Sequence, residues 1–278
     1  QLNTASDNVG IGYHALDTCA GGSNNTAVGT EAMDANTSGS ANVAVGYRAL
    51  DANTTADNNV AIGQSALGLN TTGAGNTAVG KNCLDANTTA DNNTAVGLDA
   101  LGANTTGFSN TALGKDALTA TTTGDSNVSV GQNSMAANTT GDDNVAVGQA
   151  ALDANTTADG NTAVGKSSLG ANTTGNSNVA VGSFTLDANT VGDRSVAVGY
   201  NALSTQNPAS NVDMYNTAVG FNAGLSVTTG TNNTLIGGFA GDAITTGAEN
   251  VAVGKSALSA STTAANNVAI GQSALTAS

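Results

Sequence analysis

Residues 42–58 read N-V-A-V-G-Y-R-A-L-D-A-N-T-T-A-D-N, and residues 59–75 follow the same scheme as N-V-A-I-G-Q-S-A-L-G-L-N-T-T-G-A-G. A glycine preceded by Val, Ile or Leu recurs in this way sixteen times, with a spacing of 17 residues in all but one step. We call these the repeat glycines: Gly12, Gly29, Gly46, Gly63, Gly80, Gly97, Gly114, Gly131, Gly148, Gly165, Gly182, Gly199, Gly220, Gly237, Gly254 and Gly271. The exceptional step, which follows Gly199, holds four extra residues within residues 206–215. A fixed period of this length indicates a repeat architecture with one structural unit per repeat.

Other positions of the repeat are nearly constant too. The residue four before the repeat glycine is Asn in fifteen copies, with Ser195 the exception, and the residue four after it is Leu or Met in fourteen. A helix is disfavoured because Gly recurs in every copy and costs about 1 kcal/mol in a helix interior. Two short β-favouring segments and two glycine-assisted corners per repeat predict an all-β fold, a parallel β-solenoid or β-roll of sixteen 17-residue coils. We expect a single repeat array over residues 1–278, with a four-residue insertion within residues 206–215.

Stacking the coils should place equivalent side chains above one another, about 4.8 Å apart. We expect the Asn before each strand to hydrogen-bond from coil to coil through its amide, and the repeat glycine to form a corner. This structural ladder is represented by Asn25, Asn42, Asn59, Asn76, Gly29, Gly46, Gly63 and Gly80. We also expect the Val and Leu positions to fill the interior, and the alanines between them to face the other way. A partner copy in a closed homo-oligomer would cover that alanine face; an exposed alanine face is the alternative.

Charge and composition restrict the partners. The chain has 20 acidic and 6 basic residues, a net charge of −14. A protein that neutralises phosphates needs the opposite sign, so we expect no nucleic acid partner. No apolar run approaches the roughly 18 residues of a membrane-spanning helix, so we expect no membrane insertion. Cys19 and Cys83 lie four repeats apart, roughly 19 Å in a stack and too far for a disulfide.

The sequence offers little support for catalysis. The only histidine is His14, with Cys19 as its nearest thiol, and a nucleophile and base pair needs a third orienting group and a pocket. We therefore predict a non-enzymatic protein without a cofactor, in which His14 is a surface residue.

Calcium is the one ligand that the aspartates suggest. They recur at two positions of the repeat, and stacked carboxylates could be bridged by an ion. The first aspartate series is Asp17, Asp34, Asp51, Asp85, Asp153 and Asp187, and the second is Asp57, Asp91, Asp125, Asp142, Asp159 and Asp193. Because Gly68, Gly102 and Gly170 interrupt the first series, and the G-G-x-G-x-D pattern of calcium-binding β-rolls does not occur, an ion-free surface is the main expectation and calcium the alternative.

Three copies of the strand motif read N-V-A-I-G or N-V-A-V-G, at residues 59–63, 178–182 and 267–271. They resemble the β-roll head repeats of trimeric autotransporter adhesins, and similar glycine-terminated repeats occur in phage tail fibres. The resemblance implies a left-handed parallel β-roll in a homotrimer, exposed on a cell or virion surface and used for attachment. The adhesin repeat is shorter than the one here.

Two functions of different classes are supported. The first is a structural fibre or adhesin-like shaft, extracellular or on a virion, that binds a host-surface receptor or glycan. Its distinctive surface would be Tyr200, Tyr215, Phe221 and Phe239, close to the insertion; packing of these rings around the insertion is the alternative. The second is a self-assembling extracellular filament subunit that stacks head to tail, since the sequence stops at Ser278 almost in register with its start.

An ice-binding solenoid is a third and weaker interpretation. Thr occupies the position eight after the repeat glycine in 13 of the 15 copies that reach it. Together with the preceding Asn, such as Asn53, and the following Thr, it would build a flat polar face. Adjacent strand residues point to opposite sides, so only one of the two threonines can face outward. A hydrogen-bonding ladder next to the turn is the alternative.

Overall fold

The structure is a computed structural model that describes residues 5–276. Within this range the regular elements are sixteen three-residue strands, each ending directly before a repeat glycine, and no helix. The strands are β1 (Val9–Ile11), β2 (Thr26–Val28), β3 (Val43–Val45), β4 (Val60–Ile62), β5 (Thr77–Val79), β6 (Thr94–Val96), β7 (Thr111–Leu113), β8 (Val128–Val130), β9 (Val145–Val147), β10 (Thr162–Val164), β11 (Val179–Val181), β12 (Val196–Val198), β13 (Thr217–Val219), β14 (Thr234–Ile236), β15 (Val251–Val253) and β16 (Val268–Ile270). The predicted all-β parallel β-solenoid is confirmed.

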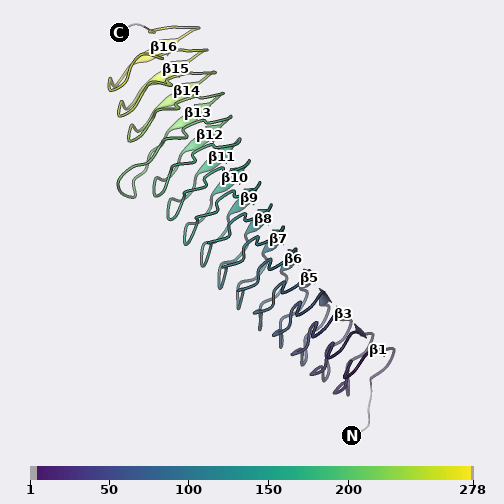
Figure 1. The fold of residues 1–278 in the computed structure, drawn as a ribbon. Coiled ribbons are helices and arrows are strands. Elements are labelled where there is room, and N and C mark those ends of the chain that lie inside the picture. Colours follow the sequence, from purple (N-terminus) through teal and green to yellow (C-terminus); the bar gives the residue numbers. More distant parts are fainter. Residues whose placement is uncertain (1–4, 277–278) are drawn as a thin grey trace. The chain divides into compact units, whose positions relative to one another are not determined.

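The chain forms two compact units, Gln1–Thr140 and Gly141–Ser278. The N-terminal unit contains β1–β8 and the C-terminal unit β9–β16 (Figure 1). Within each unit every strand pairs in parallel with the strand of the next repeat, and the paired residues are 17 apart, as for Ala61 and Ala78. The insertion lengthens one step without changing the register, because Ala197 in β12 pairs with Ala218 in β13. Each unit is thus a stack of coils with one strand per coil, so the prediction that both β-favouring segments of a repeat form strands is wrong for residues 5–276.

The side of each strand that faces the interior is the opposite of the predicted one. The central residue of the strand, such as Ala44, is fully buried, whereas the valine just before the repeat glycine faces outward, with Val45 36% exposed. The leucine position lies inside as expected, since Leu50 is fully buried, and Ala49 beside it is buried too. The expectation of an interior filled by the Val positions, with an outward alanine face, is therefore wrong. Leu50 and Ala49 already occupy the narrow interior, so in most coils only a small side chain fits beneath the strand.

β14 shows how closely the strand alanine and the leucine position are coupled. Leu235 stands where other strands have alanine and is fully buried. The leucine positions of its own coil and of the coil before it are Gly241 and Gly224. A Cβ on Gly224 would lie 2.7 Å from Leu235 Cδ1, and a Cβ on Gly241 would lie 2.6 Å from Leu235 Cδ2. The large side chain stands on the opposite wall of the coil, in the space that the two glycines leave free.

The asparagine before each strand links neighbouring coils. Asn42 donates its Nδ2 to Ala56 O at 2.8 Å, and its Oδ1 accepts the backbone N–H of Asn59 at 2.9 Å. The backbone N–H of Asn42 donates to Oδ1 of Asn25 at 3.0 Å. The four asparagines Asn25, Asn42, Asn59 and Asn76 are fully buried. We call this row the ladder asparagines, and each of their amides satisfies a buried corner and fixes the register of two coils.

A second buried row of asparagines lies seven residues after the repeat glycine. Asn53 is fully buried and donates Nδ2 to Asn36 Oδ1 at 2.9 Å and to Ala56 O at 3.1 Å. The next residue, Thr54, is half-buried and donates its hydroxyl to Thr71 O at 3.1 Å, while Thr55 is exposed. The prediction that these asparagines form part of an exposed polar face is wrong. Thr54 and its equivalents form the hydrogen-bonding ladder next to the turn.

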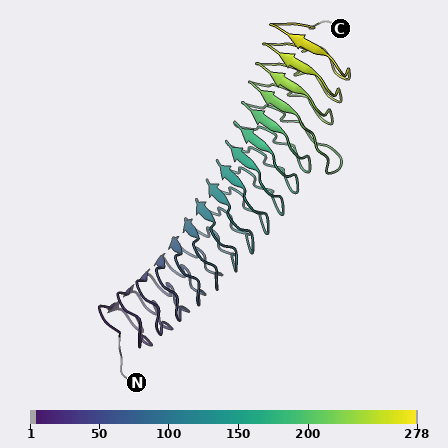
Figure 2. The same cartoon turned by 180° about the vertical axis from the view of Figure 1, so that it is seen from behind.

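The insertion forms the enlarged loop between β12 and β13 (Figure 1, Figure 2). A glutamine in this coil fills the one gap among the ladder asparagines. Ser195 takes the place of a ladder asparagine, and Gln206 donates Nε2 to Ser195 Oγ at 2.9 Å. Oε1 of Gln206 accepts from Nδ2 of Asn216, the next ladder asparagine, at 2.9 Å. Met214 is fully buried and anchors the far end of the insertion. A longer side chain and a longer coil together thus restore the coil-to-coil link that serine cannot make.

Candidate functional site

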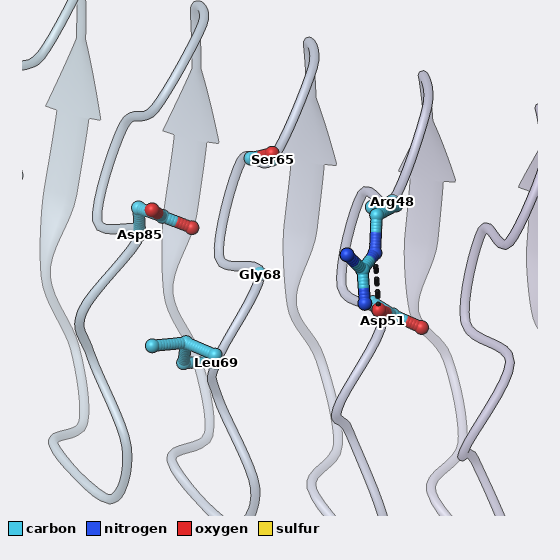
Figure 3. A pocket seen from close by; sticks show the side chains of 6 residues that line it. All are labelled: Arg48, Asp51, Ser65, Gly68, Leu69 and Asp85. Carbon is cyan, nitrogen blue, oxygen red and sulfur yellow. Dashed lines mark hydrogen bonds and ion pairs between the residues drawn. The ribbon is translucent and has the colours of Figure 1, made fainter.

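Two surface hollows form where a glycine interrupts the first aspartate series. In both, the carboxylates of the coils before and after the glycine line the opening, together with a serine. The hollow of the N-terminal unit is lined by Arg48, Asp51, Ser65, Gly68, Leu69 and Asp85 (Figure 3). The hollow of the C-terminal unit is lined by Ala150, Asp153, Ser167, Gly170, Ala171, Asp187 and Ala188. Equivalent positions of the repeat thus build the same arrangement once in each unit.

In the N-terminal unit the hollow contains a cation of the chain itself. Nε of Arg48 lies 2.9 Å from Asp51 Oδ2 and 3.3 Å from Glu31 Oε2. Asp85 leans over the glycine from the next coil, since a Cβ on Gly68 would lie 2.7 Å from Asp85 Oδ1. Burial raises the pKa of the Asp85 carboxyl above its ordinary value, and the positive charge of Arg48 partly offsets this rise. Figure 3 shows Arg48 and Asp85 on opposite sides of Gly68.

In the C-terminal unit the corresponding carboxylates have no such cation. Ala150 stands at the position of Arg48, and the hollow measures about 450 Å³, compared with about 200 Å³ beside Arg48. Burial raises the pKa of Asp153 and of Asp187. Among residues 5–276 no basic side chain lies within 4.0 Å of either carboxylate. Within residues 5–276 the two partly desolvated carboxylates of this hollow therefore form no ion pair, although Lys166 directly precedes the lining residue Ser167.

These raised pKa values predict that the two carboxyls make the fold less stable at pH 7 than at pH 4. A carboxyl whose pKa is higher in the folded than in the unfolded state stabilises the fold while it is protonated, and that contribution is lost as the pH rises from about 3.9 through the folded value. Replacing Asp187 by Asn should raise the unfolding temperature at pH 7 and reduce the difference between pH 4 and pH 7. Thermal unfolding followed by circular dichroism at both pH values measures this.

The control for this pH prediction is Asp91→Asn, which removes the same charge from the second aspartate series. Asp91 Oδ1 accepts the backbone N–H of Ala74 at 2.7 Å, and an asparagine retains this acceptor, as Asn176 does for the N–H of Asp159 at 2.8 Å. If both variants gain equally at pH 7, general charge repulsion rather than burial of Asp187 is the cause.

The second aspartate series has a structural role. Oδ1 of Asp57 accepts the backbone N–H of Ser40 at 2.7 Å, in the same way as Asp91. Oδ1 of Asp159 accepts the N–H of Asp142 at 2.8 Å. These carboxylates satisfy backbone donors of the preceding coil, and one oxygen of each is engaged there.

His14 lies near aspartates rather than near a thiol. Its Nδ1 is 3.1 Å from Asp17 Oδ2 and 3.9 Å from Asp34 Oδ1. One potential metal-binding group was found in the described part of the chain, and it consists of these three residues. Each offers one ligand atom, and the three ligand atoms lie within 4.8 Å of one another. Cys19 instead donates to Gly22 O at 3.4 Å, and Cys83 is a free, buried thiol whose pKa is raised by burial. His14 is partly exposed, as expected for a surface residue.

Three of the four predicted aromatic residues lie in one row. Tyr200 and Phe221 stack with ring centroids 5.5 Å apart, and Phe239 meets Phe221 edge to face at 5.3 Å. Phe184, which the sequence interpretation missed, extends the row at 5.9 Å from Tyr200. All four residues lie one or two places after a repeat glycine, and that shared position is the signal by which Phe184 could have been found. We call these four residues the aromatic row.

Tyr215 lies outside the aromatic row. Its hydroxyl donates to Asp213 Oδ2 at 3.1 Å, and the guanidinium of Arg194 lies 6.0 Å from its ring centroid. Arg194 also forms an ion pair with Asp213. Tyr215 therefore belongs to the contacts of the insertion, five residues before its repeat glycine rather than after one.

Comparison of the chain with protein-family models, with curated proteins and with solved structures found no match. The resemblance to adhesin head repeats and tail-fibre repeats therefore stays a prediction that the strand motif carries. In residues 5–276 no helix is long and apolar enough to cross a membrane.

Proposed function

We propose that the protein is a non-enzymatic structural shaft for attachment, exposed on a cell or virion surface, and that the aromatic row is its contact surface. The observation that carries this proposal is the aromatic row itself. Tyr200 is 46% and Phe221 50% exposed, and both project from a stack of coils whose register is held by the ladder asparagines. Exposed aromatic residues on a rigid frame are typical of interaction surfaces.

The buried polar residues support a structural role. The amides of both asparagine rows and the hydroxyls of Thr54 and its equivalents are used in bonds to neighbouring coils. The polar groups of these residues stabilise the stacking of the coils and are not directed toward a substrate site. Among the side chains that vary from coil to coil, those on the surface distinguish one part of the shaft from another.

The aromatic row suits a receptor or glycan on a host surface. Aromatic rings offer a large apolar area at low cost in side-chain entropy, and they carry much of the binding energy where they are anchored. The stacking of Tyr200 on Phe221 and the flanking contacts of Phe184 and Phe239 hold the rings in place before a ligand arrives. A preorganised surface of this kind loses little entropy on binding.

A left-handed homotrimer is part of this proposal, as the resemblance implies. The face that a second copy would cover is the outer face of the strands. Its two outward positions hold only Val, Ile, Leu or Thr in all sixteen copies, in a chain with a net charge of −14. Such an uncharged strip is suited to contact between copies, because burying it leaves no unpaired charge.

The test compares binding to a glycan array and to surface receptors for three proteins. We expect the double variant Tyr200→Gln with Phe221→Gln to lose at least tenfold in affinity, because it removes the two most exposed rings of the aromatic row. The matched control is Tyr47→Gln, since Tyr47 is 48% exposed at the same position of the repeat and Gln64 shows that glutamine is accepted there. Equal binding by the double variant and the control would refute the proposal. Long fibres in electron micrographs would favour the filament instead.

A further inference from the structure

The hollow of the C-terminal unit differs from the hollow of the N-terminal unit in one lining residue, which changes the local charge. Asp153, Ser167, Gly170 and Asp187 correspond one by one to Asp51, Ser65, Gly68 and Asp85 at equivalent positions of the repeat. The first lining residue, however, is Ala150 where the other hollow has Arg48. The pair of carboxylates at equivalent positions thus has a guanidinium beside it in the N-terminal hollow and none in the C-terminal hollow.

The N-terminal unit shows which group this arrangement accepts. There Arg48 bonds Asp51 through Nε at 2.9 Å, lies 3.3 Å from Glu31 Oε2, and shares the hollow with Asp85, whose pKa its positive charge lowers. A guanidinium is planar, is less strongly hydrated than an ammonium ion, and carries several donors in a fixed geometry that matches carboxylates. Two carboxylates on either side of a glycine suit such a group.

The glycine keeps the C-terminal hollow open. A Cβ on Gly170 would lie 3.0 Å from Asp187 Oδ1, so a side chain there would push the carboxylate aside. The space of about 450 Å³ that remains is bounded in part by Ala150, Ala171 and Ala188, whose side chains carry no polar group that could pair with the carboxylates. The carboxylates are partly removed from water and lack the partner that their counterpart Asp51 has, an arrangement that favours a cationic ligand.

We propose that the hollow lined by Asp153, Ser167, Gly170 and Asp187 binds the guanidinium group of an arginine side chain of a partner protein, in the place that Arg48 takes in the other hollow. Calcium fits less well, since it takes six to eight oxygen ligands and the side chains lining this hollow are two aspartates, one serine and small residues. This inference does not depend on the aromatic row.

The experiment is a titration of the whole chain with methylguanidinium. The amide NMR resonances of the residues that line the two hollows report binding. In the wild-type protein we expect saturable shifts at Ser167 and Gly170 and none at Ser65 and Gly68. Ala150→Arg should abolish the response, because the new side chain fills the hollow. Arg48→Ala should create a second response at Ser65 and Gly68, because it empties the other hollow. Arg48 is half-exposed, so this change should not impair folding.

Further arms of the titration identify the ligand. We expect Asp187→Asn to weaken binding at least tenfold, methylammonium to bind at least threefold more weakly than methylguanidinium, and a peptide with a single arginine to bind at least as tightly. Saturable shifts with calcium chloride at the same resonances, equal affinity for methylammonium, or an unchanged response in Ala150→Arg would each overturn the proposal. Weaker binding of the peptide would exclude a partner's arginine as the occupant.

Discussion

Replacing Asn93 by alanine is expected to destabilise the N-terminal unit by about 2 kcal/mol, since the buried backbone N–H of Asn110 left without a partner costs about 1 to 3 kcal/mol. Asn93 Oδ1 accepts this N–H at 2.9 Å, and Asn93 Nδ2 donates to Gly107 O at 2.8 Å, which keeps a second donor in Asn104 Nδ2 at 2.9 Å. Alanine removes both bonds in a site that is fully buried. Urea unfolding gives the free energy, and hydrogen exchange of the Asn110 amide reports the lost bond directly.

The control for Asn93→Ala is Thr94→Val at the neighbouring residue. Thr94 is exposed at the start of β6, and valine occupies the same position in β3 and β4. Thr94→Val should change the unfolding free energy by less than about 0.5 kcal/mol. If the Asn110 amide stays as protected in Asn93→Ala as in the wild-type protein, the ladder asparagines do not hold the coils together in the way described here.

Replacing Gly46 by alanine is expected to destabilise the same unit by about 4 kcal/mol, from backbone strain of about 1 to 3 kcal/mol and overpacking of similar size. Gly46 has a φ of +140°, a region that is essentially restricted to glycine. A Cβ there would lie 2.5 Å from Gly63 O and 2.7 Å from Gly63 C. Both atoms belong to the backbone of the next coil, so the coils must move apart. Urea unfolding of the variant measures the loss.

Gly238→Ala is the matched control for the glycine prediction. Gly238 directly follows a repeat glycine, and the nearest atom to a Cβ there is Phe221 O at 3.9 Å, an ordinary contact. This variant should be as stable as the wild-type protein or slightly more so, because alanine restricts the unfolded chain. Equal losses in Gly46→Ala and Gly238→Ala would show that the close approach of stacked coils does not explain the repeat glycines.

The candidate sites were predictable in part. The two aspartate series follow from counting positions, because equivalent residues of a repeat meet in space. Three members of the aromatic row were predicted from their nearness to the insertion, and counting positions would have added Phe184. The hollow of the C-terminal unit could not be found in this way. It requires knowing that the residue at the position of Ala150 lies beside the carboxylates of Asp153 and Asp187, and only the path of the corner brings these positions together.

The sequence by itself determined the period, the strand before each repeat glycine and the row of ladder asparagines. These features depend on local chemistry that repeats in every copy, so counting residues was sufficient. Only the tertiary structure decided which side of each strand faces inward, because alternation allows two choices and a shift by one residue exchanges them. The strand alanine points inward since Leu50 and its equivalents already fill the narrow coil, and Leu235 can replace an alanine only where Gly224 and Gly241 make room. That choice depends on the volume shared between two walls of a coil, which no single stretch of sequence contains.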